Sequence, residues 1–281
     1  MRQFDKMGCK LPNLPIRDEN SNKGTFGKIL NVSGSEYMTG ASILSSLASY
    51  KVGAGYVEVV SHQNVLKAIS CQIPEVVLAP LEKLNEVIKT STVLLIGCGL
   101  STSEDAVKIF KRAIFSAVEM NLPTIIDADG LNILANEQIE LPQNTILTPH
   151  PKEASRLLNC SLEDVLANIE QSAQRIAIKY NCITVLKSHR TVVVSSDGKT
   201  YHNTTGNSAL AKAGSGDVLA GMIAGFVAQN MSIFEASVLG VYLHGLAGDL
   251  AKEDLSAYGV LASDTIRYIS LAINSYLNSN V

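Results

Sequence analysis

The run from Thr205 to Gly221 carries residue types that could do chemistry on an anion. It opens as a small, polar loop and ends in an apolar stretch, which suits a buried helix beginning near Ser215 or Gly216. The start of a helix leaves backbone N–H groups unpaired and adds partial positive charge, and Gly214 and Gly216 let a bulky anion approach closely. An anion cradle beside the Asp217 carboxylate indicates phosphoryl transfer with Asp217 as the base. An aspartate at a helix start is also a common cap.

Short β-rich runs alternate with helical patterns along the chain, which is typical of an α/β domain with a mostly parallel sheet. Ser161 and Asp164 have the spacing of a capping box, so one helix is expected from Ser161 to about Tyr180. The other expected helices are residues 39–51, 104–118, 215–227, 233–251 and 260–277. The expected strands are residues 28–32, 56–60, 93–96, 123–126, 145–148 and 183–186, with a hairpin formed by 191–194 and 199–202.

Polar segments follow several strands at their carboxyl ends, which is the edge where open α/β sheets bind ligands. We therefore expect residues 97–99, 127–132, 150–153 and 205–217 to surround one crevice. Gly97 and Gly99 do not begin a dinucleotide-binding fingerprint, because Thr102 stands where the third glycine belongs. The sequence also shows no catalytic serine triad and no cluster of His and Cys with metal-ligand spacing, so no protein metal ligands are predicted.

Three residues after the fourth expected strand offer oxygen ligands. Asp127 and Asp129 could carry Mg²⁺ through water or bind sugar hydroxyls, and Asn132 could reach the same pocket. Aspartates that merely cap turns at strand ends are at least as common. His150 lies between two prolines, on a link expected to be rigid and poorly helical, with Glu153 close behind it; it could bind a ligand or be a satisfied structural histidine.

The segment from Lys187 to Thr191 offers two cations and two hydroxyls between two expected strands. Lys187, Ser188, His189, Arg190 and Thr191 could hold the phosphate or the ribose of a nucleotide. A solvated polar turn explains the same composition when the segment is taken by itself. Lys212, in the loop before Asp217, could contact phosphate or be a plain surface lysine.

The composition of the chain restricts the classes of protein to which it can belong. The 281 residues carry a net charge of −3, so the chain has no basic field for nucleic acid or an anionic membrane. The five cysteines show no paired spacing, which favours reduced thiols in a cytosol. The amino end lacks the apolar region of a signal peptide, and no apolar run reaches the ~18 residues of a membrane span. A soluble, cytoplasmic protein is expected, without nucleic-acid or membrane partners.

Taken together, these residues resemble the ADP/ATP-dependent NAD(P)H-hydrate dehydratases, a branch of the ribokinase-like superfamily. The similarity covers most of the chain and implies one three-layer ribokinase-like α/β domain over residues 1–281, with a central mostly parallel sheet and helices on both faces. The segments that carry the resemblance are Ser21–Gly27, Val32–Ser35, Gly53–Gly55, Pro74–Glu75, Gly97–Leu100, Asp127–Asn132, Thr148–Glu153 and Gly214–Gly221.

The resemblance implies repair of hydrated NADH and NADPH, restricted to the S epimer. ADP would activate the hydroxyl of the hydrate, and elimination would restore the cofactor with release of AMP and phosphate. Mg²⁺ and a homotetrameric assembly are implied as well. The implied hydrate contacts are Ala41, Gly99, His150 and Asp217, and the implied nucleotide contacts are Lys187, Ser188, His189, Arg190, Thr191 and Gly216. Further candidates for the site are Asp127, Asn132, Glu153, Gly214 and Ser215.

The chain departs from the family pattern at three places. Ser188 stands where a glycine is usual, Ala213 and Ser215 replace a glycine and a threonine, and Asn22 replaces a histidine.

Two other functions remain open from the sequence. A ribokinase-like kinase of a vitamin precursor would need the same anion cradle and the same aspartate. A non-catalytic module that senses adenine nucleotides would bind them without releasing phosphate.

Overall fold

A nine-stranded sheet forms the centre of the computed structural model, which describes residues 3–5 and 8–278. Its strand order is β11-β10-β9-β8-β7-β6-β3-β4-β5. Neighbours from β9 to β5 are parallel, and the β10–β11 hairpin continues the sheet in antiparallel pairing. The strands are β3 (Lys28–Val32), β4 (Tyr56–Ser61), β5 (Val77–Pro80), β6 (Val93–Ile96), β7 (Thr124–Ile126), β8 (Thr145–Leu147), β9 (Ile183–Leu186), β10 (Val192–Val194) and β11 (Thr200–His202), with a separate small sheet of β1 (Gln3–Phe4) and β2 (Lys10–Leu11).

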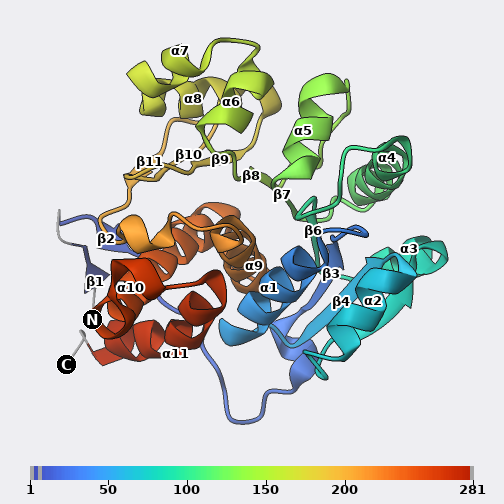
Figure 1. The fold of residues 1–281 in the computed structure, drawn as a ribbon, viewed down its shortest axis with the longest axis horizontal. Coiled ribbons are helices and arrows are strands. Elements are labelled where there is room, and N and C mark those ends of the chain that lie inside the picture. The colour runs from blue at the N-terminus through green and yellow to red at the C-terminus, as the bar shows by residue number, and fades with distance from the viewer. Residues whose placement is uncertain (1–2, 6–7, 279–281) are drawn as a thin grey trace.

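Helices cover both faces of the large sheet, as expected (Figure 1). Strand residues alternate between two hydrophobic clusters, so that Ile29 faces one cluster and Leu30 the other. The helices on the first side are α1 (Thr39–Lys51), α2 (Gln63–Ser70), α9 (Ser215–Ala228), α10 (Ile233–Gly259) and α11 (Ala262–Asn278). Those on the second side are α3 (Leu84–Val87), α4 (Glu104–Glu119), α5 (Asp129–Asn136), α6 (Pro151–Leu158), α7 (Leu162–Ala167) and α8 (Ile169–Tyr180).

Helix α9 is buried almost all round, which explains its composition of small and apolar residues. It packs against α1 at very short range. A methyl group added at Gly221 would overlap the carbonyl oxygen of Ser45, and one added at Gly225 would lie 2.8 Å from the carbonyl oxygen of Ser49. The Ser49 hydroxyl donates a hydrogen bond to the carbonyl oxygen of Gly221 at 2.9 Å. The glycines therefore allow the two backbones to touch.

The predicted helix from Ser161 to Tyr180 is wrong as a single element. The structure has two helices, α7 and α8, which meet at Asn168 with φ −150° and ψ 86°. The side chain of Asn168 accepts a hydrogen bond from the backbone N–H of Gln171, and so begins the second helix as an N-cap. The expected capping box of Ser161 and Asp164 is confirmed at the start of α7.

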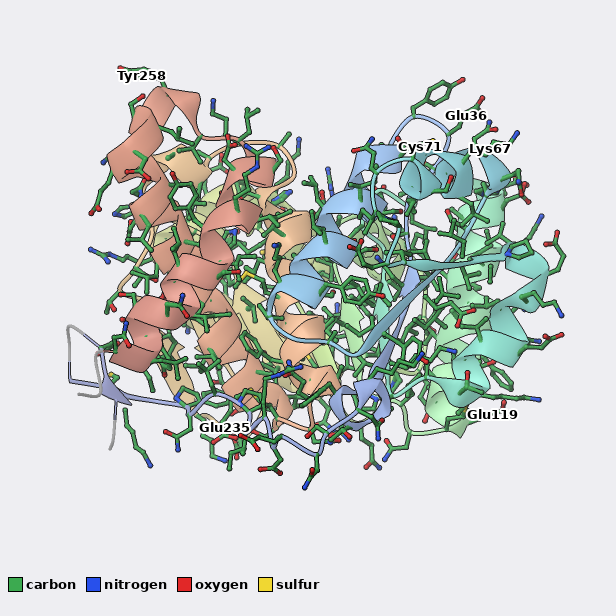
Figure 2. The ribbon with its side chains drawn as sticks, turned by 90° about the horizontal axis from the view of Figure 1, so that it is seen from below. Glu36, Lys67, Cys71, Glu119, Glu235 and Tyr258 are labelled. Atoms are coloured by element: carbon green, nitrogen blue, oxygen red, sulfur yellow. The ribbon has the colours of Figure 1, made fainter. Side chains whose placement is uncertain are left out.

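Helix α10 runs eight residues past the expected end at Ala251 and contains one non-helical residue, Ser256, at φ 65° and ψ 165°. Tyr258, just beyond this kink, is exposed, and Figure 2 shows it at the opposite side of the molecule from Lys67 and Glu119. Among the described residues, no helix has both the length and the apolar character needed to cross a membrane.

Candidate active site

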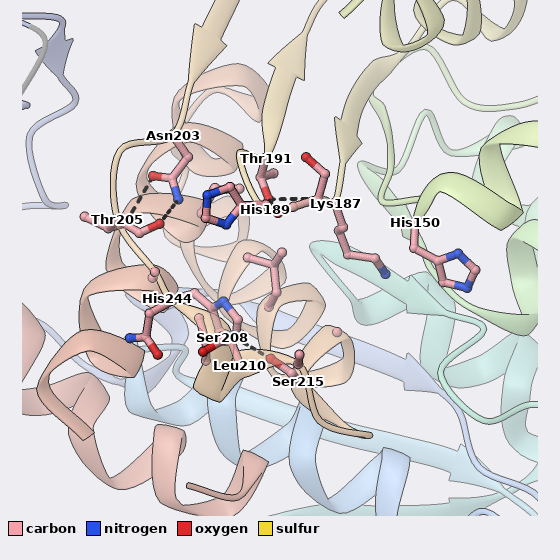
Figure 3. A pocket seen from close by; sticks show the side chains of 18 of the residues that line it. His150, Lys187, His189, Thr191, Asn203, Thr205, Ser208, Leu210, Ser215 and His244 are labelled. Carbon is pink, nitrogen blue, oxygen red and sulfur yellow. Dashed lines mark hydrogen bonds between the residues drawn. The ribbon is translucent and has the colours of Figure 1, made fainter. Parts of the chain in front are cut away.

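A cavity of about 710 Å³ opens at the carboxyl edge of the sheet, between the 187–191 turn, the 205–212 loop, the start of α9 and α10. Figure 3 shows Asn203 and Thr205 at one end and Lys187 and His150 at the other. Candidates from the sequence that line it are His150, Lys187, Ser188, His189, Thr191, Lys212, Ser215 and Gly216. The expected crevice is present in part: His150 and several residues of the 205–217 segment line the cavity, whereas residues 97–99 and 127–132 do not.

A buried ion pair anchors one end of the cavity. The ammonium nitrogen of Lys187 lies 2.6 Å from Oδ1 of Asp127, and the hydroxyl of Thr148 donates to the same oxygen at 2.7 Å. Burial alone would lower the pKa of Lys187, but the charges of Asp127 and Glu153 raise it above its ordinary value. Lys187 thus carries a fixed positive charge, and its side chain, 18% exposed, still reaches the cavity. Lys187 is therefore not part of a freely solvated turn.

Asp217 lies at the third position of α9 and does not cap it. The N-cap is Gly214, with φ 89°, and no described side chain bonds to the free N–H groups of this first turn. Burial, followed by the charge of Asp127, raises the pKa of Asp217 to about 7. A carboxylate with this pKa is a stronger base than an ordinary aspartate, and about half of it is ionised at neutral pH. The geometry favours a base over a cap.

Gly216 keeps space open between α9 and Lys187. A methyl group added there would lie 3.2 Å from the Lys187 ammonium nitrogen and 3.8 Å from Oδ2 of Asp127. Ser215, the first residue of the helix, is 3.3 Å from Nε2 of His244, a contact between α9 and α10. Burial lowers the pKa of His244 to about 4, so this imidazole is neutral. The helix start therefore faces a cation across an uncrowded gap, as anion binding requires.

The link at His150 is not poorly helical, contrary to the sequence-based expectation. His150 is the N-cap of α6 and Pro151 is its first residue, a position where the missing N–H of proline costs nothing. Nδ1 of His150 accepts from the backbone N–H of Lys152 at 3.1 Å, and Glu153 accepts from the backbone N–H of His150 at 2.7 Å. This capping box fixes the histidine with its ring about half exposed at the cavity.

Glu153 supplies a test of this arrangement through pH. Burial raises the pKa of Glu153 to about 7, against the opposing charge of Lys187. The folded protein then holds a proton that the unfolded chain releases near pH 4.5, so stability is lost as pH rises from about 5 to 8. Glu153→Gln keeps the capping bond but cannot ionise. We expect it to be more stable than the parent at pH 8, by up to ~3 kcal/mol, and nearly equal at pH 5.

Urea unfolding at both pH values measures this difference. Glu163→Gln is the matched control, because Glu163 is exposed in the first turn of α7 and should leave the pH dependence of stability unchanged. Equal stabilities of Glu153→Gln and the parent at pH 8 would show that the pKa of Glu153 is not raised in the folded protein.

Asp129 and Asn132 lie outside the cavity. Asp129 accepts a hydrogen bond from the backbone N–H of Ser101 at 2.8 Å, and Asn132 accepts one from Arg156 at 2.6 Å. Ala128, between the two aspartates, has φ 50°, a region that favours glycine and marks local strain. These side chains hold the turn after β7 in place, so the structural interpretation of Asp129 and Asn132 is the better one.

Ala41 and Gly99 lie beside each other, away from the first cavity. A methyl group added at Gly99 would lie 2.7 Å from Cβ of Ala41. Their neighbours Met38 and Leu100 line a second cavity of about 460 Å³. Of these candidate hydrate contacts, His150 lines the first cavity, whereas Ala41 and Gly99 line neither cavity and lie next to Met38 and Leu100 of the second.

The turn of residues 188–191 is ordered by its own hydrogen bonds. The Ser188 hydroxyl donates to the carbonyl oxygen of Arg190 at 2.7 Å, and the Arg190 guanidinium donates to the carbonyl oxygen of Thr204 at 3.4 Å. Ser188, His189 and Thr191 line the cavity, whereas Arg190 lies outside its lining.

Sequence reasoning missed Thr148 and His244 as neighbours of the site, and it placed Cys98 at the crevice only as part of residues 97–99, without a role of its own. Thr148 ends an expected strand and gave a weak signal, while His244 lies in the middle of a helix. Cys98, Asp127 and Asp217 have ligand atoms all within 4.8 Å of one another. A search for clusters of histidine and cysteine could not find this mixed group, because its members are far apart in the chain.

Comparison with known proteins decides the family. The family model described as NAD(P)H-hydrate dehydratase matches residues 29–271. The ADP-dependent (S)-NAD(P)H-hydrate dehydratase of Neisseria meningitidis serogroup B is 37% identical over 94% of this chain and 90% of its own length. The chain belongs to the NAD(P)H-hydrate dehydratase family. Within it, the bifunctional NAD(P)H-hydrate repair enzyme of Coxiella burnetii is 35% identical, but this chain spans only 54% of its length.

A solved structure of a relative confirms the ribokinase-like fold. The ADP/ATP-dependent NAD(P)H-hydrate dehydratase of Bacillus subtilis, co-crystallised with ATP and Mg²⁺, has a TM-score of 0.85 and 30% identity, covering 94% of each chain. The three-layer architecture predicted from the sequence is therefore that of the family.

Proposed function

We propose that this dehydratase-family chain repairs hydrated NADH and NADPH, using ADP to dehydrate the S epimer and releasing AMP and phosphate. The observation that carries the proposal is Asp217, a carboxylate whose pKa burial raises to about 7, beside a helix start that faces Lys187 across the Gly216 gap. This arrangement supplies a base and an anion cradle at one place. Relatives from N. meningitidis and B. subtilis carry the corresponding activity in their names.

Each residue then has a defined task. Asp217 takes the proton of the hydrate hydroxyl while that oxygen forms a bond to the terminal phosphorus of ADP, and AMP leaves with the bridging oxygen. Phosphate next leaves the ring carbon with the electron pair of the C–O bond, and loss of a ring proton restores the double bond. Lys187 and the N–H groups of α9 stabilise the phosphoryl oxygens. His150, Ala41 and Gly99 position the hydrate, and Ser188, His189 and Thr191 hold the nucleotide.

The carboxylate oxygens at the carboxyl edge of the sheet suit Mg²⁺. The bonds from Lys187 and Thr148 go to Oδ1 of Asp127, which leaves Oδ2 on the side of Asp217 and Cys98. Carboxylate oxygens are the ligands that Mg²⁺ prefers, mostly with waters in between. Asp127 would hold the ion through water, and the ion would neutralise charge on the nucleotide phosphates.

An assay that crosses ADP and ATP with hydrated NADH and hydrated NADPH tests this function. Recovery of the reduced-nicotinamide absorbance, together with formation of AMP from ADP, is the expected result. A phosphorylated vitamin precursor without nicotinamide recovery would establish the kinase alternative instead. Binding of nucleotide with no phosphate release for any acceptor would establish the sensor.

Gly216→Ala should separate nucleotide binding from stability. Alanine is the better helix former, so the melting temperature should stay unchanged or rise. The added methyl group would stand 3.2 Å from the Lys187 ammonium nitrogen, in the space left for phosphate. A lost charge-assisted contact is worth roughly 1.5–3 kcal/mol, so we expect nucleotide affinity to fall at least ~10-fold by calorimetry.

Gly40→Ala is the matched control for this change. Gly40 is also the second residue of its helix, and a methyl group added there meets nothing within 4 Å. Nucleotide affinity should be unchanged in this variant. Equal affinities of Gly216→Ala and the parent would remove the start of α9 from the nucleotide site.

We also propose a single-domain, cytoplasmic homotetramer for this chain. Support for the assembly and the compartment comes from the family resemblance and from the unpaired cysteines, and support for one domain comes from the single large sheet. Light scattering should give four times the 30.0 kDa chain mass. A mass of one or two chains would refute the tetramer.

A further inference from the structure

Three side chains from distant parts of the sequence converge beneath the cavity. Cys98 follows β6, Asp127 follows β7 and Asp217 belongs to α9. Their sulfur and carboxylate oxygens all lie within 4.8 Å of one another. Cys98 and Asp127 are buried, and Asp217 is partly exposed, which leaves one side of the group open to solvent.

Asp127 is oriented toward the other two. Its Oδ1 accepts bonds from Lys187 at 2.6 Å and from Thr148 at 2.7 Å. Its Oδ2 lies 3.8 Å from the sulfur of Cys98. Hydrogen bonds of this kind fix the orientation of a metal-binding carboxylate and leave its other oxygen for the ion.

We propose that Cys98, Asp127 and Asp217 form a site for a thiophilic divalent cation such as Zn²⁺. Zinc binds sulfur at about 2.3 Å and oxygen at about 2.0–2.2 Å in tetrahedral sites, which places ligand atoms roughly 3.5 Å apart. The three ligand atoms reach this spacing if they close by about an ångström. Water from the open side supplies the fourth ligand.

The charges of the three ligands also favour a divalent cation at this site. Binding releases the thiol proton of Cys98 to solvent, so the ligands then carry one thiolate and two carboxylate charges. A divalent ion and the Lys187 ammonium together balance these three charges in a buried place. Sulfur discriminates between ions, because Zn²⁺ and Co²⁺ accept thiolate ligands whereas Mg²⁺ prefers oxygen.

The consequence for catalysis rests on the proposed function. An ion bound to the Asp217 carboxylate occupies the lone pair that would accept the proton of the hydrate. Micromolar Zn²⁺ should therefore inhibit dehydration in the presence of millimolar Mg²⁺.

Co²⁺ alone is the probe for binding, because a thiolate ligand gives cobalt a near-ultraviolet charge-transfer band. The parent for this titration is the full chain with Cys9→Ser and Cys71→Ser, which removes two exposed thiols. We expect one equivalent of Co²⁺ to produce the band. The band should vanish in Cys98→Ser and persist in Cys160→Ser, the control at a partly buried thiol outside the site.

Absence of the band in the parent, or its persistence in Cys98→Ser, overturns the site. If Cys98→Ser does not fold, Asp217→Asn decides: the band should remain while Co²⁺ affinity falls at least ~10-fold, since even outer-shell partners are worth 10–100-fold. Unchanged affinity would overturn the proposal. The band reports the metal site even in a chain without dehydratase activity, so the two proposals fail separately.

Discussion

Asp217→Asn should leave the protein folded and able to bind ADP, while hydrate dehydration slows at least ~100-fold. The amide cannot accept the proton of the hydrate hydroxyl, and loss of a general base typically costs ~10²–10⁴-fold in rate. The charge at a helix start contributes only about 0.3–1 kcal/mol to stability, too little to imitate such a loss. Initial rates of nicotinamide recovery, with ADP affinity by calorimetry, measure both parts.

Asp264→Asn is the matched control. Asp264 occupies the third position of α11, as Asp217 does in α9, and it accepts a hydrogen bond from the backbone N–H of Leu261 at 3.0 Å. Removing that charge should change stability slightly and turnover hardly at all. Near-normal turnover in Asp217→Asn would end the assignment of this residue as the base.

Lys187→Ala should lower both stability and nucleotide affinity. Removal of one partner from a buried pair leaves an uncompensated charge, here on Asp127, and typically costs 3–5 kcal/mol. We expect the free energy of unfolding to fall by about 3 kcal/mol, the lower end of this range, because the cavity admits water next to the aspartate. Loss of a charge-assisted phosphate contact, worth roughly 1.5–3 kcal/mol, should also weaken nucleotide binding at least ~10-fold. Urea unfolding and calorimetry measure the two effects.

The double variant Asp127→Asn with Lys187→Ala separates these two roles. It removes the buried charge and should recover most of the lost stability, but nucleotide affinity should stay low. Failure to recover stability would show that the ion pair is not the cause of the destabilisation. An unchanged nucleotide dissociation constant in Lys187→Ala would take this lysine out of the nucleotide site.

Hydrophobic periodicity predicted most elements of the core, but it missed the short elements β5, α2, α5 and α6. The strand at Lys28–Val32 and the helix at Thr39–Lys51 match the structure to the residue, because a buried apolar run and an amphipathic stripe end at polar or glycine residues in each case. The pattern failed where a side chain competes with the backbone. Asn168 interrupts a continuous apolar stripe by capping a new helix, which no periodicity reveals.

The candidate site was predictable in outline, since parallel strands bring their carboxyl ends to one edge. Its contacts were not. Lys187 and Asp127 are separated by sixty residues, and only the register of β7, β8 and β9 places them together. For the same reason the family resemblance could assign Ala41 and His150 to one ligand but could not show that His150 lines the first cavity whereas Ala41 lies beside Gly99, outside that lining.

The backbone contact between α1 and α9 restricts how this enzyme can move. Two helices that touch through Gly221 and Gly225 cannot slide past each other without collision, so shear at this interface is blocked. Ala41 on α1 and Asp217 on α9 therefore travel as parts of one rigid body. Opening and closing around a ligand must take place in the segments above the sheet edge, such as the 205–212 loop, while the distance between the proposed hydrate contact and the proposed base stays constant.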